Sequence, residues 1–168
     1  ECKCIRCREI KNMTFSIKDL NYDYLSYDTK NNINYFISAN YNKKLVGFLR
    51  LSIKKKMIKT LNVLDNASIV RELHVYGKMK ATYLSNSSNS QNRGIGSKLL
   101  EIAETITLSH NLYKISIISG VGVRHFYTKN GYRLEENYMT KNLTHYYNYF
   151  LVFLWIILII ITYIIVFV

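Results

Sequence analysis

Three cysteines stand close together at the start of the chain, and it has no others. Cys2, Cys4 and Cys7 form the pattern C-x-C-x-x-C. Two cysteines separated by one residue disfavour a local disulfide, whereas three neighbouring thiolates suit a soft metal ion such as zinc. A fourth ligand has to come from a residue outside this sequence or from one of the histidines His74, His110, His125 and His145. The alternative is a set of free, reduced thiols.

A glycine-rich turn at residues 91–96 has the form Q-x-x-G-x-G and precedes a run with helical periodicity. Such a turn leaves backbone N–H groups unpaired at the helix N-terminus, and the missing Cβ atoms of Gly94 and Gly96 let a pyrophosphate come close. The helix dipole adds positive potential. The pattern is one glycine short of the dinucleotide fingerprint, so it does not indicate NAD binding. Taken alone, it predicts either a phosphate site or an ordinary turn.

Two titratable residues, Glu72 and His74, stand two apart in a predicted strand and therefore project from the same face of it. A carboxylate in that position can act as a general base on an amine through a water molecule. The alternative is a polar face that only contacts solvent.

The elements around these residues are predicted to be strands first and helices later. Asn42 and Lys43 predict a turn between the second and third strands, which makes those two strands antiparallel. Residues 77–90 predict a loop of low complexity. The predicted strands are 13–17, 33–41, 45–53, 68–76, 114–119 and 132–141, the last being one strand or a pair of strands. The predicted helices are 95–110 and 121–129.

The charge of the chain is strongly positive. It has 168 residues with 23 Lys and Arg against 11 Asp and Glu, a formal net charge of +12. No charged side chain lies in residues 150–168, so residues 1–149 carry all of this charge. This length and charge exclude a multidomain assembly and a disordered acidic tail. The positive charge fits binding either to an RNA backbone or to an anionic membrane surface.

Because the first residue is Glu1, we expect the sequence to be part of a longer protein.

The uncharged segment 150–168 predicts a transmembrane helix. As a helix it would span about 28 Å, close to the thickness of a bilayer's hydrocarbon core. Tyrosines in the linker 144–149 and the basic residues Lys129, Arg133 and Lys141 favour a cytosolic orientation of the rest. We expect a tail anchor in an organelle membrane, either the mitochondrial outer membrane or the endoplasmic reticulum. The alternative is a buried core helix.

Several stretches of the sequence resemble a known family. The turn Q-x-x-G-x-G, followed by a strand and then by H-F-Y-x-x-x-G-Y at residues 125–132, resembles the GNAT superfamily of acetyltransferases. More specifically, residues 1–10 (ECKCIRCREI), 68–77 (SIVRELHVYG) and 118–143 (ISGVGVRHFYTKNGYRLEENYMTKNL) resemble the acetyltransferase half of the catalytic third subunit of Elongator. Residues 11–60 match loosely, and the apolar C-terminal segment is outside the usual family pattern.

The resemblance implies an α/β GNAT fold, with a mixed, mostly antiparallel sheet flanked by helices, and the uncharged segment adds one transmembrane helix after it. We therefore expect a cysteine-containing junction (1–10), an acetyltransferase domain (11–143), a linker (144–149) and an anchor (150–168). Acetyl-CoA would lie between strands 68–76 and 114–119, with Tyr127 donating a proton to the departing thiolate. The residues expected to bind it are Glu72, Leu73, His74, Val75, Gln91, Arg93, Gly94, Ile95, Gly96, Ser97, Lys98 and Tyr127.

Members of that Elongator family add a carboxymethyl group derived from acetyl-CoA to the wobble uridine of tRNA. The resemblance implies tRNA and other Elongator subunits as partners, and a radical domain with S-adenosylmethionine and a four-iron four-sulfur cluster upstream of this sequence. The position of the cysteines at the junction favours structural zinc. Two alternatives stay open: a lysine acetyltransferase acting on histones or other proteins, with Glu72 as base and Tyr127 as acid, and a non-catalytic acyl-CoA-binding module.

Overall fold

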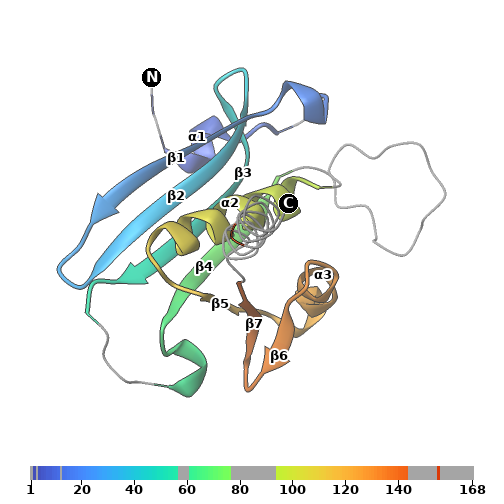
Figure 1. Cartoon of the computed structure of the whole chain (residues 1–168). Coiled ribbons are helices and arrows are strands. Elements are labelled where there is room, and N and C mark those ends of the chain that lie inside the picture. The colour runs from blue at the N-terminus through green and yellow to red at the C-terminus, as the bar shows by residue number, and fades with distance from the viewer. Residues whose placement is uncertain are drawn as a thin grey trace, which may run out of the picture.

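The computed structural model describes residues 2, 4–11, 13–56, 61–76, 94–143 and 155 (Figure 1). The strands are β1 (Asn21–Asp28), β2 (Asn32–Tyr41), β3 (Lys44–Lys54), β4 (Ala67–Val75), β5 (Lys114–Ile118), β6 (Arg133–Glu135) and β7 (Tyr138–Asn142). The α-helices are α1 (Ile5–Arg8), α2 (Ile95–Ser109) and α3 (Arg124–Lys129), and short 3-10 helices cover Ile17–Asp19, Asn62–Leu64 and Val121–Val123.

The strands form one sheet in the order β1-β2-β3-β4-β5-β7-β6. The first four are antiparallel and follow one another in the sequence. β5 is parallel to β4, so the chain has to cross over between them, and α2 makes this crossover on one face of the sheet (Figure 1). β7 is antiparallel to β5, with β6 at the edge. The predicted mixed and mostly antiparallel α/β architecture is therefore confirmed.

The turn between β2 and β3 is the one that the sequence predicts. Asn42 and Lys43 connect the two strands, and their φ angles are 47° and 65°. Positive φ at both central residues matches the right-handed twist of the flanking strands, and asparagine adopts it more readily than most residues do. The turn sets the register of the longest ladder in the sheet.

The first strand differs from the prediction. Residues 13–17 form no ladder; Phe15 is buried there and its ring lies 6.0 Å from that of Tyr41. The strand next to β2 is β1, which the sequence analysis missed. β1 is an edge strand with nearly every residue exposed, including Leu25 at 66%, so its sequence lacks the alternation of apolar and polar residues that marks a half-buried strand.

A β-bulge at Arg71 interrupts the ladder between β3 and β4. The extra residue reverses the alternation of side chains along β4. Val70 therefore packs in the core with Leu73, whereas a regular alternation along residues 68–76 would place Val70 on the same face as Glu72. Glu72 and His74 lie beyond the bulge, on the face opposite Leu73.

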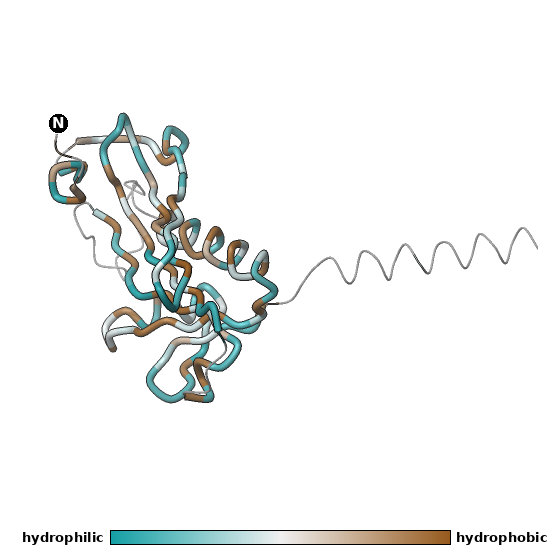
Figure 2. Tube along the Cα trace, turned by 90° about the vertical axis from the view of Figure 1, so that its left-hand side faces the viewer, coloured by the Kyte–Doolittle hydropathy of each residue, from teal (hydrophilic) through white to brown (hydrophobic). Residues whose placement is uncertain are grey.

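The core lies between the sheet and α2. Leu99 and Ala103 of α2 are fully buried against Ile37 and Leu49 of the sheet. Figure 2 shows apolar and polar residues alternating along the helix and strands, as expected for elements with one buried face. Each large aliphatic side chain removed from water here contributes about 1.5 to 3 kcal/mol to the stability of the fold.

The predicted membrane segment 150–168 and the linker 144–149 lie outside the described residues, apart from Trp155. Among the helices in the described ranges, none combines the length and the apolar character needed to cross a bilayer.

Candidate active site

β4 and β5 run as a ladder over only part of their length. Their pairing joins residues 67–70 to residues 114–117, and β4 then continues to Val75 with β3 as its partner. The peptide groups of β4 that point toward β5 beyond Val70 are therefore available to another partner. The predicted acetyl-CoA residues Glu72, Leu73, His74 and Val75 all lie in this half of β4.

Gly94 begins α2 and has a left-handed backbone, with φ of 102°. A side chain at this position would be strained, although nothing among the described residues lies within 4 Å of it. Among the described residues no side chain caps this helix N-terminus, and its first N–H groups have no carbonyl partners inside the helix. Ile95 is fully buried and anchors the turn, whereas Ser97 and Lys98 lie at the surface of the first turn. Gln91 and Arg93 are outside the described residues.

Gly96 lies against α3. A Cβ atom there would be 2.9 Å from Cζ of Phe126, so the missing side chain is what lets the two helices pack together. The ring lies where a side chain of residue 96 would lie. Since Phe126 precedes Tyr127, the same contact holds Tyr127 near the N-terminus of α2.

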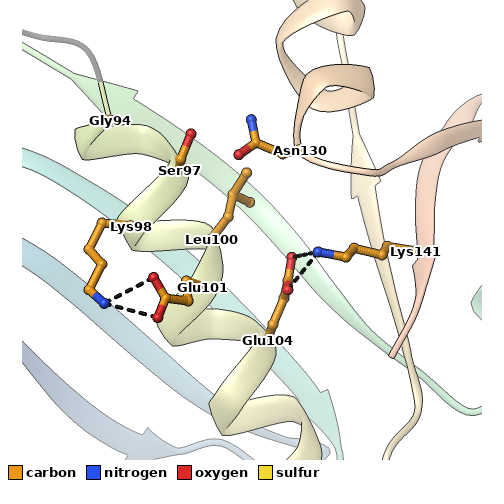
Figure 3. A pocket seen from close by; sticks show the side chains of 8 residues that line it. All are labelled: Gly94, Ser97, Lys98, Leu100, Glu101, Glu104, Asn130 and Lys141. Carbon is orange, nitrogen blue, oxygen red and sulfur yellow. Dashed lines mark hydrogen bonds and ion pairs between the residues drawn. The ribbon is translucent and has the colours of Figure 1, made fainter. Parts of the chain in front are cut away.

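A cavity of about 380 Å³ opens beside the first turns of α2 (Figure 3). Two lysines reach it, and both are ion-paired: Lys98 Nζ lies 2.9 Å from a carboxylate oxygen of Glu101, and Lys141 Nζ lies 2.8 Å from one of Glu104. The cavity is lined by Gly94, Ser97, Lys98, Leu100, Glu101, Glu104, Asn130 and Lys141. Glu104, Asn130 and Lys141 are site residues that the sequence analysis missed, because no spacing connects α2 with β7.

Tyr127 is buried in α3, with 6% of its surface exposed. Its ring makes edge contacts with Phe126 at 5.2 Å and with Tyr132 at 6.1 Å. Burial raises the pKa of the Tyr127 hydroxyl above the usual value of 10. The phenol therefore keeps its proton throughout the neutral range, the form in which it can act as an acid.

Glu72 and His74 are exposed beyond the bulge. Glu72 Oε2 lies 3.4 Å from Nη1 of Arg50, and the two side chains are 45% and 46% exposed. An ion pair this exposed contributes at most about 1 kcal/mol, so the carboxylate can exchange its partner at little energetic cost. The His74 ring packs against Tyr76, with centroids 4.5 Å apart, and against Phe48 at 6.1 Å.

The three cysteines are brought together by α1. Their Sγ atoms all lie within 4.8 Å of one another, and all three residues are exposed. Cys4 is the N-cap of α1 and its Sγ accepts a hydrogen bond from the N–H of Cys7, at 3.4 Å. This bond from the Cys7 N–H, followed by bonds with the Cys2 and Cys7 thiols, lowers the pKa of the Cys4 thiol to about 7. The side-chain hydrogen bond with Cys4 raises the pKa of the Cys7 thiol. The donor set fits a thiophilic cation.

None of the described histidines joins the cysteine group. His110 is instead bonded through Nε2 to the hydroxyl of Tyr35, at 2.7 Å, and His74 packs against Tyr76. His125 is exposed on α3, and His145 lies outside the described residues. Within the part of the chain that the structure describes, the fourth ligand is unassigned.

The site has the features of an acyl-CoA-dependent acyltransferase: a parallel strand pair that separates beside the N-terminus of the crossover helix, with a buried tyrosine nearby. The chain belongs to the acetyltransferase (GNAT) family, which it matches over residues 5–132.

The relatives of this chain agree with the more specific resemblance. Elongator complex protein 3 of Danio rerio is 35% identical over 150 residues, which make up 85% of this chain and 27% of that protein. The tRNA uridine(34) acetyltransferase of Dehalococcoides mccartyi is 36% identical over 152 residues, 85% of this chain and 33% of that protein.

A solved structure is also similar. The archaeal Elp3 of Methanocaldococcus infernus, with an N-terminal deletion, superimposes with a TM-score of 0.70 at 32% identity and covers 85% of this chain. The resemblance predicted from the sequence is confirmed. The chain spans between 27% and 36% of the length of these three relatives.

Proposed function

We propose that this chain is the acetyl-CoA-binding acetyltransferase domain of an Elongator-type enzyme that modifies the wobble uridine of tRNA. The observation that carries the proposal is the separation of β4 from β5 beyond Val70, beside the open N-terminus of α2. The similarity to two tRNA uridine(34) acetyltransferases and the net charge of +12 support tRNA as the acceptor. Assembly with other Elongator subunits belongs to the same proposal.

The residues present fit acetyl-CoA. The peptide groups of residues 72–75 offer hydrogen bonds to an amide-containing arm, and the N–H groups at Gly94 suit a pyrophosphate. The cavity beside α2 has room for the nucleotide end of the molecule. When bound, acetyl-CoA supplies an acyl group activated as a thioester.

The protein groups proposed to move protons are Tyr127 and Glu72. Tyr127 holds its phenolic proton at neutral pH, since burial raises its pKa, and can donate it to a leaving group. Glu72 is exposed and weakly paired, so its carboxylate is free to accept a proton from an acceptor or from water. His74, on the same face of β4, is the second candidate for this role.

The test is tRNA-dependent release of free CoA from acetyl-CoA by the purified full chain. We expect tRNA with uridine at the wobble position to stimulate release, and tRNA with cytidine there to do so less. Tyr127→Phe should lower the rate about 100-fold or more, the usual contribution of a general acid. The affinity of this variant for acetyl-CoA, measured by calorimetry, should fall by about tenfold at most, the cost of one lost hydrogen bond.

Two outcomes contradict the proposal. If a lysine-containing histone peptide stimulates CoA release and tRNA does not, the chain is a protein acetyltransferase. If acetyl-CoA binds but Tyr127→Phe behaves like the wild type and no acceptor stimulates release, the chain is an acyl-CoA-binding module.

The cysteine group is proposed to hold structural zinc, because three thiols within 4.8 Å of one another match the donor set of closed zinc sites. We expect one zinc per chain by elemental analysis and its loss in Cys4→Ser, with Ser16→Ala, another helix-capping residue, as the control. A zinc-free chain in which all three thiols react with a thiol reagent would contradict the site.

Attachment to an organelle membrane through residues 150–168 is likewise a proposal, supported by their lack of charged side chains. Trp155 is the one tryptophan of the chain and lies in this segment, so its fluorescence reports on it. We expect its emission to shift to shorter wavelength when the chain is mixed with phospholipid vesicles. An emission that stays at the wavelength of a water-exposed indole would contradict the anchor.

A further inference from the structure

Two glycines between β5 and α3 have no structural reason of their own to be glycine. Gly120 has φ of −63° and ψ of 149°, which any residue adopts, and Gly122 has no left-handed φ. A Cβ atom at either position would meet nothing within 4 Å among the described residues. The other described glycines do have such a reason, either a left-handed φ or a close neighbour within 3.0 Å: Gly94, Gly131, Gly47 and Gly96.

A glycine that neither a left-handed φ nor a close neighbour in the fold requires is typical of places where a ligand or another chain comes close to the backbone. The residues around these two glycines fit that explanation, because their apolar side chains point outward. Ile118 is 62% exposed, Val121 77% and Val123 49%. Isolated apolar residues are common on surfaces, but these three lie within six positions and together offer apolar surface to a partner.

Arg124 follows this patch and is the first residue of α3. Its Nε is buried and has no hydrogen-bond partner in the described part of the chain. Buried guanidinium donors are normally satisfied, and no described residue holds the Arg124 side chain through this atom. The guanidinium is cationic and residues 118–133 contain no Asp or Glu, so the partner that it favours is an anion.

The patch lies next to the reacting groups. It continues β5 from the point where that strand has left β4, and Arg124 and Tyr127 are three positions apart on α3, so they are neighbours on one side of the helix. A partner bound at Gly120 and Gly122 is therefore brought to the tyrosine that is proposed to act as the acid.

We propose that residues 118–124 are the surface on which the RNA acceptor docks. The backbone at Gly120 and Gly122 admits the ribose and base of one nucleotide, the valines pack against the flat face of the base, and the Arg124 guanidinium binds a phosphate. The inference rests on the proposed function, since it takes RNA as the acceptor. It adds the place where that acceptor is recognised, for which the sequence analysis named no residue.

The experiment compares three variants of the full chain. Gly120→Leu fills the docking space without internal clash or backbone strain, and Arg124→Gln removes the charge. Lys129→Gln, an exposed cation at the end of the same helix, is the matched control. Binding of fluorescein-labelled tRNA is measured by anisotropy at several salt concentrations, and acetyl-CoA binding by calorimetry.

We expect Gly120→Leu and Arg124→Gln each to weaken tRNA binding about tenfold, and Arg124→Gln also to reduce the slope of log affinity against log salt by about one phosphate contact. Lys129→Gln and the affinity for acetyl-CoA should be nearly unchanged. If both test variants bind tRNA like the wild type, or if they lose acetyl-CoA instead, the surface is not the acceptor site. Failure of the proposed function would differ, because tRNA would then not stimulate CoA release by the wild-type chain.

Discussion

At the scale of residues, the wall of the cavity beside α2 depends on one partly buried carboxylate. Glu104 accepts a hydrogen bond from the hydroxyl of Tyr132 at 2.8 Å and two from Lys141 Nζ at 2.8 and 2.9 Å. Tyr132 is 2% exposed, and Lys141 Nζ also lies over its ring at 5.5 Å. Removing one member leaves the others at least partly buried and with fewer partners, which is costly for polar groups.

Tyr132→Phe should therefore lower the free energy of unfolding at neutral pH by about 1 to 3 kcal/mol. Burial, the first cause, and the negative charge of Glu104 raise the pKa of the folded Tyr132 hydroxyl, while the unfolded side chain ionises near pH 10. A raised folded-state pKa gives stability that is present below pH 10 and lost as the pH rises above it. Wild-type stability should consequently fall more steeply above pH 10 than that of the variant.

Urea unfolding at pH 7 and above pH 10 measures both effects. Tyr24→Phe is the control, because Tyr24 is 56% exposed and should change neither the stability nor its pH dependence. A variant as stable as the wild type at pH 7 would contradict the role given to the hydroxyl.

Some site residues belong to a motif in the sequence, and others reach the site only through the packing of the fold. Gly94 and Tyr127 belong to motifs of consecutive residues, so the sequence alone identified them as candidates. Arg50, Glu104 and Lys141 come to the site through strand register and helix packing, and their partners are distant in the sequence. No periodicity encodes such pairs, which is why the sequence analysis missed them.

At the scale of elements, the packing of α3 on α2 depends on Gly96. Glycine to alanine in a helix normally stabilises a protein, by up to about 1 kcal/mol. Here we expect the opposite sign, a loss of about 1 to 3 kcal/mol, because the added methyl group would lie 2.9 Å from the Phe126 ring.

The double variant Gly96→Ala, Phe126→Leu distinguishes this clash from a general defect. Shortening residue 126 removes the obstacle, so in that background the alanine should become neutral or stabilising. Denaturant unfolding of the four proteins in the cycle gives the coupling energy, expected at about 0.5 to 3 kcal/mol. Additive losses would mean that the two residues do not interact.

The elements that the sequence predicted well are those with one buried face. β2, β3 and α2 have a regular apolar period, and their observed bounds agree with the prediction to within a few residues. β1 failed because an exposed edge strand needs no such period. The alternation along β4 failed at Arg71 because a bulge is decided by the partner strand and leaves no trace in the strand's own sequence.

At the scale of the whole molecule, the separation of β4 and β5 divides the sheet into β1–β4 and β5–β7, with α2 across both. A ligand bound between the two parts contacts both of them and stabilises only the folded chain. At a concentration 100 times its dissociation constant, acetyl-CoA should raise the free energy of unfolding by about 2.7 kcal/mol. Thermal unfolding across a concentration series measures this, and adenosine, which lacks the arm and the phosphates, is the control. An unchanged midpoint at saturating acetyl-CoA would contradict a site between the two parts.

The strand order also has a consequence for the time course of folding. β1 to β4 pair with neighbours that are adjacent in the sequence, whereas β5 reaches β4 only after the loop and α2 have been made. Local pairings form quickly and distant ones slowly, so we expect β1–β4 to be ordered first in a nascent chain and β5 to dock later, together with β7 and β6. The short parallel ladder between β4 and β5 should be the first to open in the native state, and amide hydrogen exchange should be faster in β5 than in β3. The strand through which the second part joins the sheet is then also the one that leads directly into the loop before Tyr127.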